Sequence, residues 1–155
     1  MKRLILLIAI ILLNKISNAQ VVLNFDQREA KGIRSSQLDS IYKSGTHADS
    51  TLAVFASNPE KYYEIYTKML QGFGKHLTEN NFIWEKPTNG FNRIYFNENG
   101  KVDYYLYSFR PGQISKEKEM EFEKLLKEYF NTYQFPLPTK EKFAQCSPVT
   151  YSPKK

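Results

Sequence analysis

Two runs of strand-forming residues, separated by Asn97-Glu98-Asn99-Gly100, constrain the fold of this chain more than any other feature. The runs cover residues 91–96 and 102–109, and aromatic and aliphatic side chains predominate in both. Such runs with a glycine-containing turn between them are typical of a β-hairpin. We therefore expect an antiparallel hairpin at about 91–109.

Two registers of this hairpin are open, and they place different side chains on one face. A two-residue turn at Asn99-Gly100 would pair Phe96 with Asp103 and so put a carboxylate on the apolar side. A type I turn over 97–100, with the glycine in the left-handed conformation, pairs Phe96 with Val102 instead. We prefer the second register because it separates apolar from polar residues.

The preferred register creates a tyrosine-rich face, which is a candidate binding surface. It places Tyr95 opposite Asp103 and Arg93 opposite Tyr105. Tyrosine is enriched at recognition surfaces, so this face could receive a protein or peptide. The other interpretation is that residues 20–57 cover it, because large exposed aromatic patches are rare on monomers. The candidate binding residues are Arg93, Tyr95, Asp103, Tyr105 and Tyr107.

Two amphipathic helices are predicted, at about 59–79 and 116–133, from apolar residues that recur every three or four positions. Asn58-Pro59 favours the start of the first helix, and Ser115 favours the start of the second. The prolines of Phe135-Pro136-Leu137-Pro138 cannot continue a helix. The apolar positions are Tyr62, Tyr66, Met69 or Leu70, Phe73 and Leu77 in the first helix, and Phe122, Leu125, Leu126, Tyr129, Phe130 and Tyr133 in the second.

A last extended run covers residues 143–151, and Pro148 restricts it to an edge strand or a bulge. The expected edge-strand residues are Phe143, Gln145, Val149 and Tyr151. Together the elements indicate an α+β fold. Its antiparallel sheet is built on the hairpin plus the terminal strand, and it packs against the two amphipathic helices.

The first nineteen residues have the layout of a cleaved secretory signal peptide. Lys2 and Arg3 precede an apolar run of ten residues from Leu4 to Leu13. A membrane span needs about 20 such residues, so we expect no stable membrane anchor. Cleavage between Ala19 and Gln20 would release an exported protein, either periplasmic or secreted.

Removal of this leader changes the chain length and the net charge, which indicate the number of domains and the kind of binding partner. It would leave 136 of the 155 residues and, without Lys2, Arg3 and Lys15, a net charge of +3 in place of +6. So small an excess is not typical of a nucleic-acid-binding protein. We divide the chain into a signal peptide (1–19), a partly irregular lead-in (20–57) and a single α+β domain (58–155).

No motif for catalysis or for metal or cofactor binding is present in the sequence. His47 and His76 have no Cys, Asp or Glu at metal-ligand spacing, and no Gly-rich phosphate loop or Gly-x-Ser-x-Gly elbow occurs. A dyad of Cys146 and His76 stays open, because such partners meet in space and not in sequence. The favoured interpretation of this pair is two unrelated residues. Because no catalytic or ligand-binding motif occurs, we expect no metal, no cofactor and no catalytic residue.

Cys146 is the single cysteine, so it cannot form an internal disulfide. We expect this free thiol to be buried as a small apolar side chain, since cysteine is among the most often buried residues. A disulfide-linked dimer through Cys146 is the less favoured interpretation.

Residues 90–151 resemble the C-terminal domain of TonB-type energy transducers. The resemblance is carried by Ile94-Tyr95-Phe96-Asn97-Glu98-Asn99-Gly100-Lys101-Val102, by the apolar helix that ends near 133–136, and by Pro148-Val149-Thr150-Tyr151. It implies a fold that adds a strand of a partner protein to its sheet edge, at residues 143–151. It does not imply energy transduction. The whole chain also resembles small exported proteins of the Bacteroidetes type.

These observations favour an exported, non-enzymatic interaction module for an unknown protein or peptide. It would bind through the tyrosine-rich face or through the terminal edge strand. The alternative is a small-molecule-binding protein or hydrolase with a pocket between the helices and the aromatic sheet. A deep polar cavity would favour the alternative, and a flat uncovered tyrosine surface would favour the interaction module.

Overall fold

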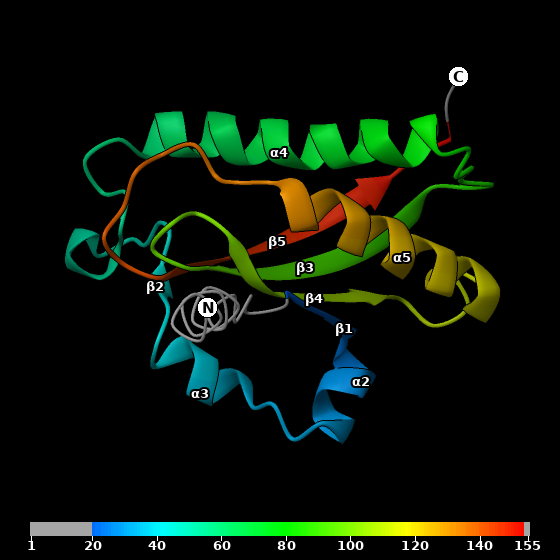
Figure 1. Cartoon of the computed structure of the whole chain (residues 1–155), viewed down its shortest axis with the longest axis horizontal. Helices are drawn as coiled ribbons and strands as arrows, with labels where there is room; N and C mark the ends of the chain where they lie inside the picture. Colours follow the sequence, from blue (N-terminus) through cyan, green and yellow to red (C-terminus); the bar gives the residue numbers. More distant parts are fainter. Residues whose placement is uncertain (1–19, 154–155) are drawn as a thin grey trace, which may run out of the picture.

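The computed structural model describes residues 20–153, which form a five-stranded sheet flanked by helices (Figure 1). The strand order is β1-β4-β3-β5-β2. The strands are β1 (Val21–Asn24), β2 (Lys43–Ser44), β3 (Thr88–Phe96), β4 (Val102–Phe109) and β5 (Phe143–Tyr151). β3 and β4 form the expected hairpin, and β5 lies antiparallel to β3 on its other side. The α+β class is therefore confirmed.

The expectation of a purely antiparallel sheet is wrong, because β1 runs parallel to β4 and β2 runs parallel to β5. Both strands belong to the lead-in (residues 20–57). They are four and two residues long. Strands this short carry too little alternation to be recognised in a sequence. Their place in the sheet is fixed by contacts with strands far along the chain.

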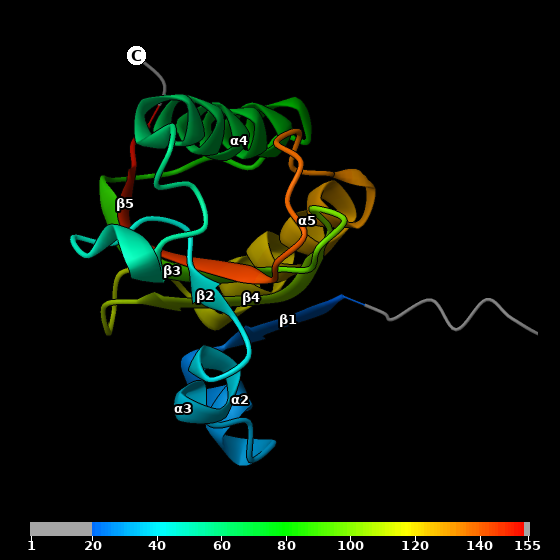
Figure 2. The ribbon, with the colours of Figure 1, turned by 90° about the vertical axis from the view of Figure 1, so that its left-hand side faces the viewer.

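The two long helices, α4 (Pro59–Glu79) and α5 (Lys116–Thr132), match the predicted segments closely. The Asn58 side chain accepts a hydrogen bond from the backbone N–H of Lys61, and the Ser115 hydroxyl accepts one from the N–H of Lys118. Both bonds satisfy donors that a helix leaves free at its start. The apolar stripes of both helices pack on the same face of the sheet and form the main core (Figure 2).

The opposite face of the sheet is covered by the lead-in, through α2 (Phe25–Ala30) and α3 (Ser35–Asp39) (Figure 2). A short 3-10 turn, η1 (Ser50–Leu52), then leads toward α4. This arrangement creates a second, smaller core beneath the lead-in. Its buried members are Leu23, Leu38, Tyr42, Tyr95 and Leu106.

The turn of the hairpin has the predicted conformation. Gly100 has a φ of 74° and donates its N–H to the carbonyl of Asn97 over 2.9 Å, and Phe96 pairs with Val102. One residue further, Tyr95 pairs with Tyr104. Asp103 is therefore an extra residue in β4, which makes this point a β-bulge.

The bulge reverses the predicted faces of β4 beyond Asp103. Because side chains alternate along a strand, one inserted residue moves every following side chain to the other face. Tyr105 and Tyr107 consequently enter the main core and are 0% and 1% exposed, while Tyr104 and Leu106 face the lead-in. The predicted pairs of Tyr95 with Asp103 and of Arg93 with Tyr105 are wrong.

We predict that Tyr107→Ser lowers the free energy of unfolding by about 3–5 kcal/mol, the range for removing a buried aromatic ring. The Tyr107 ring lies 5.3 Å from that of Phe122, and its hydroxyl donates to Glu123 over 3.1 Å. Tyr63 is 49% exposed, so Tyr63→Ser is the matched control and should change stability by less than about 0.5 kcal/mol. Urea denaturation measures both variants, and equal small losses would contradict the bulged register.

We also predict that Gly100→Ala destabilises the protein more than Gly32→Ala. Both glycines have positive φ, 74° and 68°, so alanine costs about 1–2 kcal/mol at either position. A Cβ at Gly100 would lie 2.5 Å from the carbonyl oxygen of Phe135, whereas nothing lies within 4 Å of one at Gly32. The overlap should add about 1–3 kcal/mol at Gly100. Equal urea midpoints for the two variants would show that the turn does not pack against this segment.

Candidate functional site

The outer edge of β5 is the first component of the candidate site. The carbonyls of Lys142 and Ala144 accept bonds from Lys43 and Gly45, at 3.0 and 2.9 Å, so even-numbered residues direct their backbone groups away from β3. Backbone groups alternate in direction along a strand. The backbone groups of Cys146, Pro148 and Thr150 therefore also point away from β3. Within residues 20–153, this part of β5 pairs with no strand on its outer side.

Two features make this edge less receptive than a plain strand. Pro148 has no N–H, so one outward hydrogen-bond donor is missing from the edge. Because this N–H would point away from β3, its absence removes no hydrogen bond between β3 and β5. The Gln145 side chain donates its amide to the carbonyl of Cys146 over 2.9 Å. Natural sheets protect their edges from non-specific pairing by such means. The edge therefore offers a limited set of backbone groups, notably the N–H of Cys146 and both groups of Thr150.

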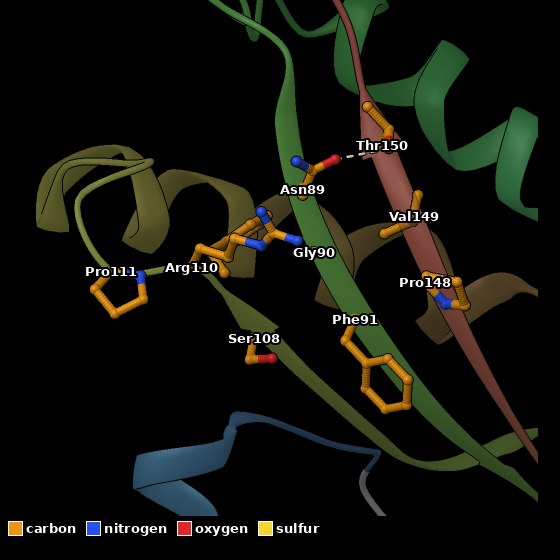
Figure 3. Close-up of a pocket in the computed structure, with 10 residues that line it drawn as sticks. Asn89, Gly90, Phe91, Ser108, Arg110, Pro111, Pro148, Val149 and Thr150 are labelled. Carbon is orange, nitrogen blue, oxygen red and sulfur yellow. Dashed lines mark hydrogen bonds between the residues drawn. The ribbon is translucent and has the colours of Figure 1, made fainter.

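A groove of about 510 Å³ adjoins this edge, where β3 begins and β4 and β5 end (Figure 3). We call it the sheet-end groove. It is lined by Asn89, Gly90, Phe91, Ser108, Phe109, Arg110, Pro111, Pro148, Val149 and Thr150. Three strands thus contribute to one concave surface, and its Phe91 wall adjoins α2.

Close strand approach and polar ties give the groove its shape. Gly90 allows the approach, since a Cβ there would lie 3.2 Å from the carbonyl oxygen of Ser108. The Thr150 hydroxyl donates to the Asn89 side chain over 2.8 Å, and the backbone N–H of Asn89 donates to the side chain of Gln113 over 2.9 Å. These bonds fix β5 and the loop after β4 against β3. The shape of the groove is therefore maintained by hydrogen bonds that its own lining residues make.

The groove combines an apolar wall with one free cation. Phe91 is 37% exposed, and its ring makes an edge contact with Phe25 of α2 at 6.2 Å. Figure 3 shows Phe91 and Ser108 on the side of the strands where the blue ribbon of α2 lies, and Arg110 between Pro111 and Gly90. Arg110 forms no ion pair with any residue of the described part of the chain. A ligand with an apolar side chain and an acidic group would complement this surface.

The five residues of the predicted tyrosine-rich face do not share a face. Tyr105 and Tyr107 lie in the main core, and Tyr95 is 0% exposed beneath the lead-in. Arg93 is on the same side of the sheet as Tyr95, and Asp103 is the bulge residue between the two phases of β4. The expectation of one exposed surface is corrected by the bulge and by the covering lead-in.

Polar side chains of the lead-in hold it on Tyr95, Arg93 and Asp103. Asp39 at the end of α3 forms an ion pair with Arg93 and accepts a hydrogen bond from the Tyr95 hydroxyl over 3.2 Å. The Tyr42 hydroxyl donates to Asp103 over 2.7 Å. Burial, together with this carboxylate, raises the pKa of Tyr42 well above its ordinary value. These residues therefore have a structural role in the attachment of the lead-in.

The strand predicted at 143–151 exists with those bounds, but β2 pairs with its first two residues, so only its later part is an edge, and the four named residues are not the outward ones. Phe143, Gln145, Val149 and Tyr151 direct their backbone groups to β3 and their side chains to the helices. The outward positions are the alternate residues, among them Pro148 and Thr150. Pro148 in the sequence was the signal for them, because proline is tolerated where its missing N–H faces away from the neighbouring strand.

The residues that the sequence left open as catalytic partners lie apart in the structure. Residues 20–153 contain no group of three or more His, Cys, Asp or Glu side chains that could hold a metal ion. Cys146 pairs with Arg93 on the lead-in side of the sheet, whereas His76 packs on Tyr129 between the helices, so the two do not form a dyad. Between helices and sheet the rings pack closely, for example Tyr105 on Phe130 at 4.9 Å. A pocket of about 260 Å³ nevertheless lies between β4 and α5, where Val102, Asp103, Phe130 and Asn131 are among its lining residues. The small-molecule site stays a prediction.

No family model, curated protein or solved structure matches this chain. The likeness to the TonB-type domain accordingly stays a resemblance of residues 90–151. Across residues 20–153, every helix is too short or too polar to cross a bilayer. The signal peptide predicted for residues 1–19, with Ala19 at its end, lies outside the described residues, which begin at Gln20.

Cys146 is exposed, so the expectation of a buried thiol is wrong. The side chains of Cys146 and Pro148 lie on the same face of β5, because the two residues are two positions apart in the strand. The outer edge of the strand is open at this point. Partial burial of the sulfur raises the pKa of Cys146 above its ordinary value, the nearby Arg93 lowers it, and Asp39 raises it further. The disulfide-linked dimer stays a prediction.

We predict that iodoacetamide alkylates Cys146 more slowly than free glutathione at pH 8. The thiolate is the reactive form, and a raised pKa leaves less thiolate at a given pH. The rate should rise with pH and reach half of its maximum at a higher pH than for glutathione. Mass spectrometry of samples quenched over time gives the rates. A midpoint at or below that of glutathione would contradict the described surroundings of the sulfur.

Proposed function

We propose that this protein is an exported, non-catalytic binding module that takes an extended peptide segment of a partner protein along β5. The observation that carries the proposal is the open outer edge of β5 directly beside the sheet-end groove. An added strand gains affinity from backbone hydrogen bonds and specificity from pockets for its side chains. This site has both components next to each other.

The geometry of strand addition assigns a task to each component. Cys146 and Thr150, which are four residues apart in β5, supply outward backbone groups that can bond to an added strand. Side chains of directly opposed residues share a face of the sheet. A ligand residue opposite Pro148 would therefore project to the side on which Phe91 lies, at the groove.

Charge gives the ligand a second feature. Arg110 has no ion-pair partner among residues 20–153, and a charge-assisted bond from a guanidinium to a carboxylate is stronger than a neutral hydrogen bond. An extended segment with an apolar residue and a nearby acidic group therefore fits the site best. The export part of the proposal rests on the leader sequence and on the resemblance to exported proteins.

The experiment is a selection of random peptides on the purified protein, followed by measurement of their dissociation constants for designed variants. Thr150→Pro removes an outward N–H and, with the hydroxyl, the bond to Asn89 of β3, so it should weaken selected peptides about tenfold, equivalent to about 1.4 kcal/mol. Thr150→Val is the matched control, since it loses the same hydroxyl bond to Asn89 but keeps the N–H, and it should bind selected peptides severalfold more tightly than Thr150→Pro does.

Phe91→Ser tests the groove in the same assay and should also weaken binding about tenfold. Ile83→Ser is its control, because Ile83 is 67% exposed and does not line the groove. The proposal fails if no peptide is selected, or if the selected peptides tolerate both Thr150→Pro and Phe91→Ser.

A further inference from the structure

Helix α4 and strand β5 run side by side in the same direction (Figure 1). Two hydrogen bonds fix their relative position. The Tyr62 hydroxyl donates to the Gln145 side chain over 3.0 Å, and the hydroxyls of Tyr66 and Ser147 bond over 2.7 Å. Four residues of a helix rise about 6 Å, and two residues of a strand rise about 6.6 Å. One turn of α4 therefore matches two residues of β5.

The buried stripe of α4 has a flank on either side. The flank toward α5 contains Gly72, which lies against the Tyr129 hydroxyl. Tyr63, Leu70 and Gly74 lie on the opposite flank, because residues four and seven apart return to nearly the same side of a helix. In Figure 2, α5 lies to the right below α4, and the end of β5 lies to the left. We call the side with Tyr63, Leu70 and Gly74 the outer flank.

The lead-in shows that a segment on the outer side of β5 meets the outer flank. β2 pairs with the first two residues of β5, and the N–H of Gly45 then donates to the carbonyl of Ala144 over 2.9 Å. The next residue, Thr46, bonds through its hydroxyl to that of Tyr63 over 2.7 Å. A strand added farther along the same side of β5 would therefore meet the following turns of the outer flank.

Those turns carry Leu70 and Gly74. Glycine lowers the stability of a helix interior relative to alanine, and residues 20–153 offer no packing reason for it at position 74. A Cβ there would have nothing within 4 Å, in contrast to one at Gly72. Leu70 is only partly buried against the main core. The two residues thus leave apolar surface and free space beside the open edge, which we call the helix shelf.

We infer that the ligand segment presents two successive apolar residues, one to the sheet-end groove and the next to the helix shelf; this inference rests on the proposed strand addition. Side chains alternate between the faces of a strand, and directly opposed residues share a face. The ligand residue opposite Pro148 projects to the groove. The residue opposite Val149 projects to the helix side, and the match of one helix turn to two strand residues places Val149 at the level of Leu70.

The free space at Gly74 favours a large side chain on the helix shelf. A glycine lets an aromatic ring or a branched chain lie close to the helix backbone, and Leu70 adds apolar contact. The chemical class of the ligand is therefore an extended segment with two adjacent large apolar residues. The acidic group that complements Arg110 belongs near the residue in the groove.

Selection of random peptides on the native protein and on two variants tests this inference. Peptides selected on the native protein should share two adjacent large apolar positions. Gly74→Gln fills the helix shelf, so peptides selected on it should lose the preference at one of these positions and keep it at the other. Phe91→Ser should have the reverse effect, because it alters the groove instead.

Dissociation constants provide a second measurement. Peptides selected on the native protein should bind Gly74→Gln about tenfold more weakly and Gly74→Ala within about twofold. Gly74→Ala is the matched control, since it also replaces glycine but adds only a methyl group. Both variants should raise the midpoint of thermal unfolding by about 2–5 °C, because both residues favour a helix over glycine. Weaker binding would then not reflect unfolding.

The result that would overturn the inference is distinct from failure of the strand addition. If Gly74→Gln binds like the native protein and selects the same two positions, while Thr150→Pro still weakens binding, the helix shelf is not part of the site. If no peptide is selected, or if Thr150→Pro and Phe91→Ser are both tolerated, the strand addition is wrong and the inference falls with it.

Discussion

The β-bulge at Asp103 is the local constraint on which the arrangement of this protein depends. With one residue inserted, the sheet directs Tyr105 and Tyr107 toward the long helices, and Tyr104 and Leu106 toward the lead-in. Both faces thereby become apolar, and each needs its own cover. The helices α4 and α5 cover one face, and the lead-in covers the other. Without the bulge, the hairpin would have one apolar and one mixed face.

Asp103 also ties the bulge to its surroundings. Its carboxylate accepts bonds from Tyr42 of the lead-in at 2.7 Å and from the Asn97 side chain of the turn at 2.9 Å. Removing either partner would leave a carboxylate oxygen unpaired at a partly buried position. The turn, the bulge and the lead-in therefore stabilise one another, although the lead-in lies far from the other two in the sequence.

Local sequence signals predicted the elements that local interactions determine. Asn58-Pro59 and Ser115 marked the helix starts, Gly100 marked the turn, and Pro148 marked an edge strand. Which residues face which side of β4 and β5 was not predictable in this way, because it depends on strand pairing. The bulge residue Asp103 bonds to Tyr42, 61 positions away. No pattern within a short window contains that information.

The candidate site, too, was predictable only where it depends on local sequence and not where it depends on strand pairing. A proline in β5 indicated that the strand lies at an edge, but the outward residues could be identified only from the bonds of Lys43 and Gly45 to the preceding part of the strand. The sheet-end groove combines residues from three strands and the loop after β4, so no single segment of the sequence shows it. Arg110 and Phe91 were consequently absent from the sequence-based candidates.

The central claim is that the sheet is covered on both faces and open along the outer side of β5 from Cys146 to Thr150. Amide hydrogen exchange measured by NMR on the native protein tests it most directly. The N–H groups of Gln145, Ser147 and Val149 should exchange slowly because they point to β3, whereas those of Cys146 and Thr150 should exchange at nearly unprotected rates. Equal, strong protection of all five amides would mean that the outer side of β5 is paired, and it would contradict the account.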